Sequence, residues 1–351
     1  MWFTSDNAAG AAPEVLEALA RANEGYAGAY GGDPLTARVQ DMIRETFEAP
    51  DAAVHFVATG TAANSLALAC LTPSWSGVYC HRAAHIEVDE CGAPEFFTGG
   101  AKMVLVDGDD GLMTPDALDA VIPKADGHPV HHVQRGALSL TNATECGTVY
   151  TPADVRALTD IAKAKGAPVH MDGTRFANAI ATLGCSPAEL SWKAGVDILC
   201  LGATKNGALA AEAVIIFDPD MAWEFELRRK RGGHLFSKMR FVAAQFEAMM
   251  TNDLWLRNAR HANAMADQLA GGILSITGGS LMHPRQANLV FASLPRAAHK
   301  AAMAKGAAYH FWPMSQAKEG PDDEPVSCRL VCSSQTRESD VDAILAAFRS
   351  A

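Results

Sequence analysis

Short apolar runs that alternate with helix-like segments restrict the fold of this chain more than any other feature. Strand-like runs cover residues 52–59, 76–81, 101–107, 131–140, 167–173, 196–203 and 212–218. Helix-like segments cover 60–71, 114–122 and 151–166, and the last two open with Thr-Pro, which favours a helix start. Such alternation over about 200 residues predicts an α/β layer with a mostly parallel sheet. Ligands of such folds usually bind beyond the carboxyl ends of the strands.

The pattern changes near residue 245. Residues 241–273 read as one long helix, and strand-like runs follow at 287–294, 306–312 and 326–334, before a helical tail at 338–350. We therefore predict two domains. Residues 1–245 form an N-terminal segment and a large domain, and residues 246–351 form a smaller C-terminal α/β domain.

Composition excludes several classes of function. The 351 residues are 49% hydrophobic and carry a net charge of −11, which argues against nucleic-acid binding. The N-terminus has no signal-peptide pattern, and no apolar run approaches the roughly 20 residues of a membrane span. We therefore expect a cytoplasmic protein without membrane contact. The eight cysteines are scattered without a C-x-x-C pair, which favours reduced core thiols over a metal site or disulfides.

The stretch VATGTAANS, residues 57–65, passes from a strand through Gly60 and Thr61 into a helix. Small residues let the backbone approach a ligand, and the free N–H groups of a helix start attract phosphate. Neither the Walker spacing nor G-x-G-x-x-G is present. Taken alone, the stretch is explained at least as well by an ordinary helix start with a threonine cap.

Two charged residues stand at the ends of later strands. Asp172 closes the run VHMD, where it could pair with a protonated ring nitrogen, cap a helix or form an ion pair with Arg175. Lys205, in GATKNG, lies among small residues that leave room for a flat cofactor, and a desolvated lysine can form a Schiff base. A surface loop lysine is the alternative. The order of phosphate-type loop, strand-end Asp and strand-end Lys is much less expected by chance than any one of them.

That order is also found in a known family. The stretches SDN, YGGDPLTARVQ, TGTAANSLAL, AAHIEVDECGAPEFFTGGAK, HMDGTRFANA, GATKNG, RRKRGGH and CRLV extend nearly from end to end of the chain. They resemble the threonine aldolases among the fold-type I pyridoxal-phosphate enzymes. DECGAPEFF, GATKNGALAAEA and GHLFSKMRF are most similar to the phenylserine aldolase or low-specificity L-threonine aldolase branch. The resemblance implies pyridoxal 5'-phosphate as the cofactor and a large domain of the fold-type I transferase-like kind.

The resemblance also implies roles for individual residues around the cofactor. Lys205 matches the Schiff-base lysine, Asp172 the partner of the pyridinium nitrogen, and Gly60 and Thr61 the phosphate loop. His85 matches a histidine that stacks on the ring, and it is a candidate to take the β-hydroxyl proton of the substrate. A packed or cap-forming histidine is the alternative.

On the substrate side, Arg175 and Arg329 match family arginines, and Arg175 is also expected beside the cofactor. Arg329 sits in an apolar strand, where burial of an unpaired guanidinium would cost free energy. Two hydrogen bonds from Arg329 to the substrate α-carboxylate would explain its presence there. A structural ion pair is the alternative. Ser5 matches a serine near that carboxylate, and Tyr30 matches a tyrosine close to the active site.

Other matching residues imply sites shared between subunits. His131 matches a histidine that a neighbouring subunit supplies to the hydroxyl side of the substrate, for catalysis and substrate binding, with His132 as the alternative. Lys230 and Arg240 match positions that reach the phosphate across an interface, although a basic run is more often a solvated surface. These matches predict a homodimer or homotetramer.

The function predicted on this basis is reversible cleavage of L-β-hydroxy-α-amino acids to glycine and an aldehyde. L-Threonine, L-allo-threonine and L-phenylserine are the expected substrates, and the aldehyde side chain, methyl or aryl, is left open. A β-eliminating lyase with the same cofactor is the alternative enzyme. The alternative from another class is a non-catalytic α/β protein that binds a ligand or acts as a scaffold, forms no Schiff base and is therefore colourless.

Overall fold

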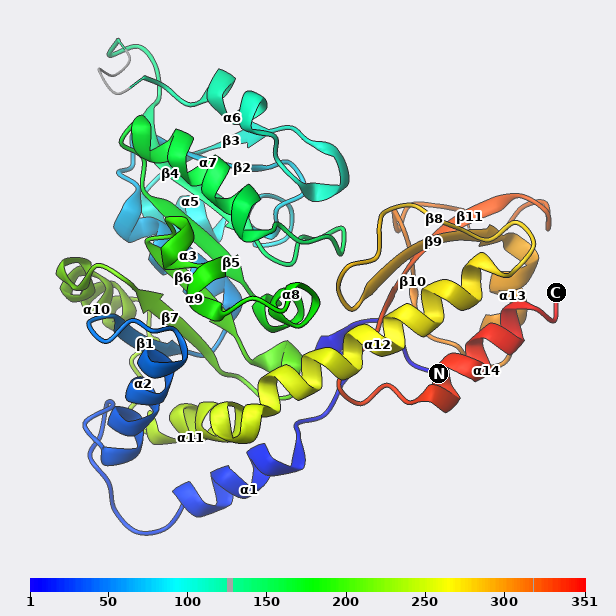
Figure 1. Ribbon diagram of the computed structural model, residues 1–351, viewed down its shortest axis with the longest axis horizontal. Coiled ribbons are helices and arrows are strands. Elements are labelled where there is room, and N and C mark those ends of the chain that lie inside the picture. The colour runs from blue at the N-terminus through cyan, green and yellow to red at the C-terminus, as the bar shows by residue number, and fades with distance from the viewer. Residues whose placement is uncertain (125–128, 318) are drawn as a thin grey trace.

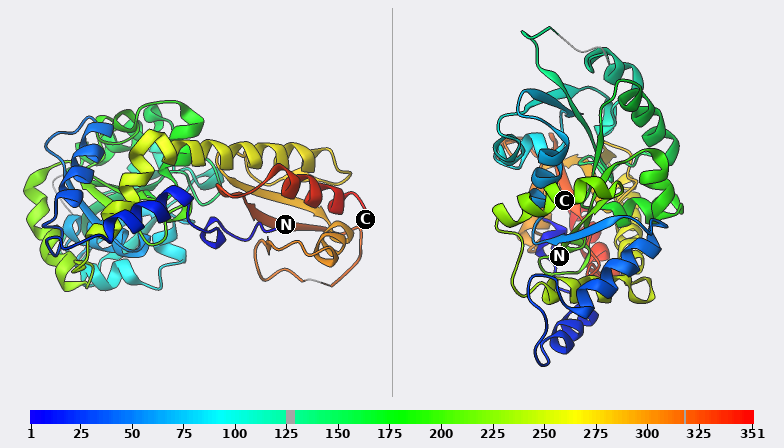
Figure 2. Two further views of the ribbon diagram at one scale, coloured as in Figure 1. Left: turned by 90° about the horizontal axis from the view of Figure 1, so that it is seen from below. Right: turned by 90° about the vertical axis from the view of Figure 1, so that its left-hand side faces the viewer.

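The computed structural model describes residues 1–124, 129–317 and 319–351. Its two sheets lie at opposite ends of the molecule, and the helix α12 (Leu254–Leu274) runs from one to the other (Figure 1). Both chain termini lie at the smaller sheet (Figure 2). Among the described helices, none combines the length and hydropathy that a membrane crossing requires.

The larger sheet has seven strands in the order β1-β7-β6-β5-β4-β2-β3. Their bounds are Ala53–Val57 (β1), Ser76–His81 (β2), Lys102–Val106 (β3), Gln134–Thr141 (β4), Val169–Gly173 (β5), Ile198–Gly202 (β6) and Glu212–Ile216 (β7). β7 is antiparallel to β1 and β6, and the other pairs are parallel. Each strand overlaps a predicted run, and the mostly parallel sheet is confirmed.

Eleven α-helices accompany this sheet in the described residues. They are α1 (Pro13–Ala22), α2 (Pro34–Thr46), α3 (Gly60–Leu71), α4 (His85–Val88), α5 (Ala93–Thr98), α6 (Pro115–Val121), α7 (Pro152–Ala164), α8 (Phe176–Leu183), α9 (Pro187–Leu190), α10 (Ala222–Arg231) and α11 (Arg240–Met250). The Thr-Pro signals are confirmed, because Thr114 and Thr151 cap α6 and α7 and each helix has proline in its first turn. Helices on both faces explain why β2, β5, β6 and β7 are buried along their whole length.

The single long helix predicted over residues 241–273 is wrong. The structure has two helices, α11 and α12, separated by a turn at Thr251–Asp253. Asn252 and Asp253 have φ values of 52° and 54°, in the left-handed region that Asn and Asp tolerate better than most residues. The break lets α11 pack against α1 and α2 while α12 extends to the smaller sheet.

The smaller sheet is antiparallel, in the order β10-β11-β9-β8. Its elements are β8 (Ser280–Leu281), β9 (Leu289–Pro295), β10 (His310–Phe311), β11 (Pro325–Val331), α13 (Arg296–Ala304) and α14 (Glu338–Phe348). The N-terminal segment joins this unit, because Trp2 bridges to Ala308 and Phe3 is buried in the same apolar cluster. Residue 245 lies inside α11, and the division of the chain at that residue stays a prediction.

Candidate active site

Lys205 lines a cavity of about 310 Å³ at the carboxyl ends of β5 and β6. The start of α3 borders the cavity from the other side. Its lining residues are Asn7, Ala58, Thr59, Gly60, Thr61, Asn64, His85, Glu90, Thr174, Thr204, Leu209, Ala210 and Glu212. The predicted residues Gly60, Thr61, His85 and Lys205 therefore share one site.

Asp172 lies at the end of β5 with 2% of its surface exposed. Its Oδ1 accepts hydrogen bonds from the Thr174 N–H at 2.9 Å and the Thr174 hydroxyl at 2.7 Å, and its Oδ2 accepts one from Asn64 Nδ2 at 2.9 Å. Burial raises the pKa of Asp172, but the two bonds from Thr174 and the nearby histidines outweigh it and hold the pKa below its usual value. The ion pair with Arg175, one of the alternatives, is absent from the described structure, in which Arg175 pairs with Asp6. Asp172 is thus a buried anion with neutral bonded partners.

Lys205 stands in a short 3-10 turn, Thr204–Asn206, directly after β6. Burial lowers the pKa of its amine, and the neighbouring Arg175 cation lowers it further, against the pull of Asp6, Asp172 and Glu212. A lowered pKa increases the fraction of uncharged amine, which is the nucleophilic form. The alternative of a fully solvated loop lysine does not fit this partly buried position.

The other end of the cavity is the N-terminus of α3. Thr59 caps the helix by accepting a bond from the Ala62 N–H at 3.2 Å, as the threonine-cap interpretation predicted. The first N–H groups of a helix, here those of Gly60 and Thr61, have no intrahelical acceptor, so they can bind an anion. A Cβ atom on Gly60 would lie 3.4 Å from Thr174 Oγ1, an ordinary contact, so packing alone does not require glycine there.

These groups fit pyridoxal phosphate. Lys205, whose pKa is lowered, can bond the aldehyde of the cofactor. Asp172, a buried carboxylate with neutral partners, can pair with the protonated ring nitrogen, and the N–H groups at the α3 N-terminus can bind the phosphate.

Arg175 is held by an N-terminal carboxylate. Its Nε and Nη2 donate to Asp6 Oδ2 at 2.8 Å and Oδ1 at 2.9 Å, and Asn288 also donates to Asp6. Ser5 caps the short turn that carries Asp6, and its hydroxyl accepts a bond from the Asn7 N–H. The pair fastens the first residues of the chain to the large domain. The ion pair with Asp6 also uses two N–H groups of the Arg175 guanidinium, which leaves fewer donors for a substrate.

Arg329 of β11 has more of its donors available. Its Nη2 donates to Thr4 O at 3.3 Å, and its Nε is buried without a partner in the described residues. Its guanidinium carbon lies 5.2 Å from the centre of the Trp312 ring. Burial and the nearby Arg175 lower the pKa of Arg329, so an anion beside both arginines would be favourable.

The residues expected at a subunit interface lie outside the Lys205 cavity of their own chain. The Lys230 ammonium sits 4.9 Å from the centre of the Tyr30 ring, and Tyr30 is 51% exposed. Arg240 donates to Gly25 O at 3.2 Å. His131 is exposed in a turn next to the undescribed residues 125–128. Shared sites therefore stay a prediction.

Sequence reasoning missed several residues of the site. Asn64 and Glu90 form a buried pair beside Asp172. Glu145 accepts a bond from the His85 N–H at 2.6 Å, and burial, with a smaller contribution from Asp172, raises the pKa of Glu145 to about 7. Glu212 accepts a bond from the Ala203 N–H at 3.1 Å, and burial raises its pKa to about 7. A signal was present for Asn64 and Glu212, which are polar residues inside otherwise apolar or small stretches, whereas Glu90 stands beside Asp89 and close to Glu87 in an acidic stretch that does not distinguish it.

The small residues around Lys205 have a packing role that their sequence pattern did not reveal. A Cβ atom on Gly202 would lie 2.3 Å from the Thr174 carbonyl oxygen, and one on Gly207 would lie 2.9 Å from Asn258 Nδ2. Gly207 also has a φ of 113°. Gly202 lets two backbone segments approach each other, and Gly207 supplies a left-handed backbone conformation beside the Asn258 side chain.

Gly202→Ala is therefore expected to lower the free energy of unfolding by roughly 1–3 kcal/mol, because the new methyl group meets backbone that cannot move aside. Urea titration followed by circular dichroism measures the loss. Gly271→Ala is the matched control, because no atom lies within 4 Å of a Cβ at that position in α12. Equal stability of the two variants would contradict the packing role.

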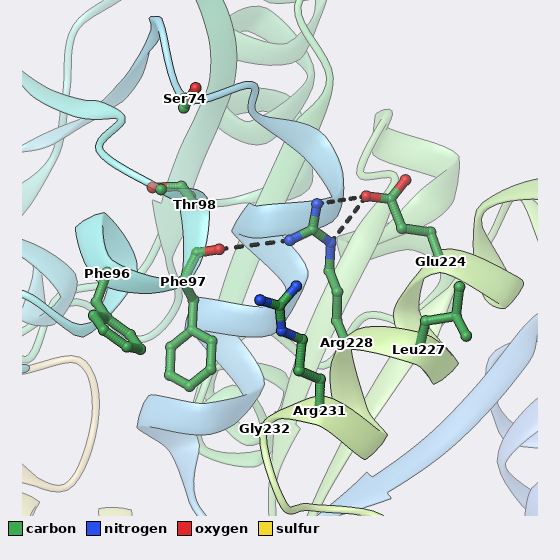
Figure 3. A pocket seen from close by; sticks show the side chains of 10 residues that line it. Ser74, Phe96, Phe97, Thr98, Glu224, Leu227, Arg228, Arg231 and Gly232 are labelled. Carbon is green, nitrogen blue, oxygen red and sulfur yellow. Dashed lines mark hydrogen bonds and ion pairs between the residues drawn. The ribbon is translucent and has the colours of Figure 1, made fainter.

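A larger cavity, about 740 Å³, lies elsewhere, between α5 and α10 (Figure 3). Arg228 crosses it, bound to Glu224 and to the Phe97 carbonyl oxygen. Arg231 and the side chains of Phe96, Phe97 and Leu227 also line it (Figure 3). Because Arg228 is already paired and both Lys205 and His85 are absent from the lining, we do not assign the chemistry to this cavity.

Comparison with known proteins agrees with the site. The sequence model of a family described as beta-eliminating lyase matches residues 3–296. A low specificity L-threonine aldolase of Pseudomonas aeruginosa is 48% identical over 305 residues, 87% of this chain and 87% of that protein. One from a Pseudomonas sp. is 41% identical over 347 residues, 99% and 96% of the two chains. The solved structure of a Leishmania major threonine aldolase superposes with a TM-score of 0.90 at 27% identity, covering 99% of this chain and 98% of that one. The chain therefore belongs to the low-specificity L-threonine aldolase family, whose members are fold-type I enzymes that use pyridoxal phosphate.

Proposed function

We propose that this protein cleaves L-threonine, L-allo-threonine and L-phenylserine reversibly to glycine and the corresponding aldehyde. The observation that carries the proposal is one cavity lined by Lys205 and the α3 N-terminus, with Asp172 bonded to the lining residues Asn64 and Thr174. The Pseudomonas relatives, which are named for the threonine reaction, support it. A cytoplasmic location and a homodimer or homotetramer are part of the proposal.

When bound, pyridoxal phosphate supplies an electron sink for the pair of electrons released by the breaking Cα–Cβ bond. Lys205 Nζ would be the amine that holds the cofactor, because its lowered pKa favours the uncharged, nucleophilic form. Asp172 keeps the proton on the ring nitrogen, because its depressed pKa leaves it anionic. The N–H groups of Gly60 and Thr61 hold the phosphate.

The remaining residues orient the substrate and move its proton. Arg329 holds the α-carboxylate together with the free part of the Arg175 fork, and that grip sets the Cα–Cβ bond in the orientation needed for cleavage. His85 Nε2 accepts the proton of the β-hydroxyl, directly or through a water molecule. Proton removal lets the hydroxyl-bearing carbon leave as an aldehyde.

Arg329→Ala is expected to raise KM by about 10- to 100-fold while the cofactor stays bound, because a charge-assisted grip on a carboxylate is worth roughly 1.5–3 kcal/mol. Steady-state kinetics with L-threonine and the visible spectrum of the variant measure both effects. An unchanged KM would indicate instead that Arg329 is a structural residue bound to Thr4.

A product assay tests the function itself. Purified protein with added cofactor is offered both enantiomers of threonine, allo-threonine and phenylserine, and glycine and aldehyde are quantified. We expect cleavage of the L-forms. The name of the matching family makes β-elimination the second candidate, and pyruvate with ammonia in place of glycine would establish it.

A further inference from the structure

A buried glutamate contacts the imidazole that we propose as the base. Glu90 follows α4, and its side chain has no exposed surface. Its Oε1 lies 2.9 Å from His85 Nδ1. The other ring nitrogen, Nε2, lies 3.9 Å from Asp89 Oδ2, and Asp89 is exposed, so Nε2 has only a distant acidic neighbour.

Asn64 holds this glutamate in place from α3. Its Nδ2 donates to Glu90 Oε1 at 3.0 Å and to Asp172 Oδ2 at 2.9 Å. One amide thus bridges the two carboxylates, and a continuous chain of hydrogen bonds runs from His85 through Glu90 and Asn64 to Asp172. Because Asn64 is itself buried, Glu90 cannot turn away from His85 without breaking buried hydrogen bonds.

The charge of Glu90 has few other partners. Its Oε2 is buried without a hydrogen bond in the described residues, and so is Asn64 Oδ1. A buried carboxylate with so few donors gains most from a proton on His85 Nδ1. That proton leaves Nε2 as the acceptor in the neutral ring, and it makes the ring a stronger base.

We propose that Glu90 is a positioning residue of the aldol reaction, which fixes the Nδ1–H tautomer of His85 and stabilises its imidazolium form after it has taken the β-hydroxyl proton. The inference rests on the proposed function for its kinetic part. The Glu90 hydrogen bond raises the pKa of His85, against the effect of burial, and Asp172 adds to the increase. Other charged groups near the ring are Asp89, Glu145 and Lys205, of which Lys205 lowers the pKa.

Glu90→Gln tests the proposal, with Glu87→Gln as the matched control. Both variants remove one negative charge beside α4, but Glu87 is exposed and makes no bond to the His85 ring in the described structure. A glutamine amide can donate to Nδ1, which would place the ring proton on Nε2 and block the base. We expect kcat to fall by about 10- to 100-fold.

The pH profile separates positioning from a structural effect. His85 must be uncharged to accept a proton, so its pKa sets the acid limb of the kcat/KM profile. Loss of Glu90 lowers that pKa and moves the acid limb to lower pH, by about one unit. Glu87→Gln is expected to leave the limb and kcat unchanged. Glu90→Asp, which keeps the charge but shortens the side chain, is expected to restore part of kcat and of the pH shift.

Nitrogen-15 histidine spectra of the holoenzyme read the tautomer without any substrate, with the His85 signals assigned by their loss in His85→Asn. A parent ring protonated on Nδ1 and a Glu90→Gln ring protonated on Nε2 would support the proposal, even if the products are not those of an aldolase. The same tautomer and the same acid limb in parent and Glu90→Gln would overturn it. If Glu90→Gln does not fold, Glu90→Asp decides by the same two measurements.

Discussion

Replacing Lys205 with alanine is expected to leave a folded, colourless protein without aldolase activity. The side chain ends in the cavity and donates no hydrogen bond to the described residues, so its loss leaves the fold intact. The protein should lose the absorbance at about 420 nm that a lysine-bound pyridoxal cofactor gives. Activity should fall at least about 1,000-fold, because no other amine lines this cavity in the described residues.

Lys193→Ala is the control for this variant. Lys193 lies at the surface, paired with Glu48, and its loss should change neither colour nor rate. Absorbance spectra, borohydride trapping of the cofactor and the aldehyde assay measure the difference. Yellow colour and aldehyde release from Lys205→Ala would show that another lysine does the chemistry.

Asp172→Asn is expected to lower kcat by about 100-fold or more and to weaken cofactor binding. The neutral amide cannot keep a proton on the ring nitrogen, so the ring withdraws electrons less well. Asparagine has the same shape and can still accept the bonds from Thr174, which limits the damage to the fold. Kinetics at saturating cofactor, a cofactor titration and thermal unfolding separate these effects.

Asp160→Asn removes the same charge from the exposed surface of α7 and should leave all three measurements unchanged. A full rate in Asp172→Asn would assign ring protonation to another group. A large loss of stability with normal cofactor affinity would make Asp172 a structural residue that holds Thr174 in the turn after β5.

The strands of the large domain and the helices α3, α6 and α7 were predictable because their local signals are strong. Fully buried parallel strands need continuous apolar runs, and Thr-Pro favours a helix start, although Thr72-Pro73 follows the end of α3 and begins none. The break at Asn252 and Asp253 was not predictable, since both residues are compatible with a helix and the left-handed turn depends on the different packing partners of α11 and α12.

The candidate site was only partly accessible to the same reasoning. Lys205, Asp172, Gly60 and Thr61 follow strand ends, and parallel strands bring their carboxyl ends to one edge. Asp6 could not be assigned, because it pairs with Arg175 across 169 positions of the chain. The role of Glu90 likewise depends on the distance to His85 in the folded chain.

The sequence by itself determined the α/β class, the strand-end placement of Lys205 and Asp172, and the family, because apolar periodicity and ordered short motifs are local properties. Only the tertiary structure decided which charges meet. In the folded chain Arg175 pairs with Asp6, and Arg329 Nε has no partner in the described residues. Hydrogen bonds through Glu90 and Asn64 connect His85 to Asp172. Hydrogen bonds and pKa shifts depend on distances of a few ångströms and on burial, and both arise only when segments far apart in the chain pack together.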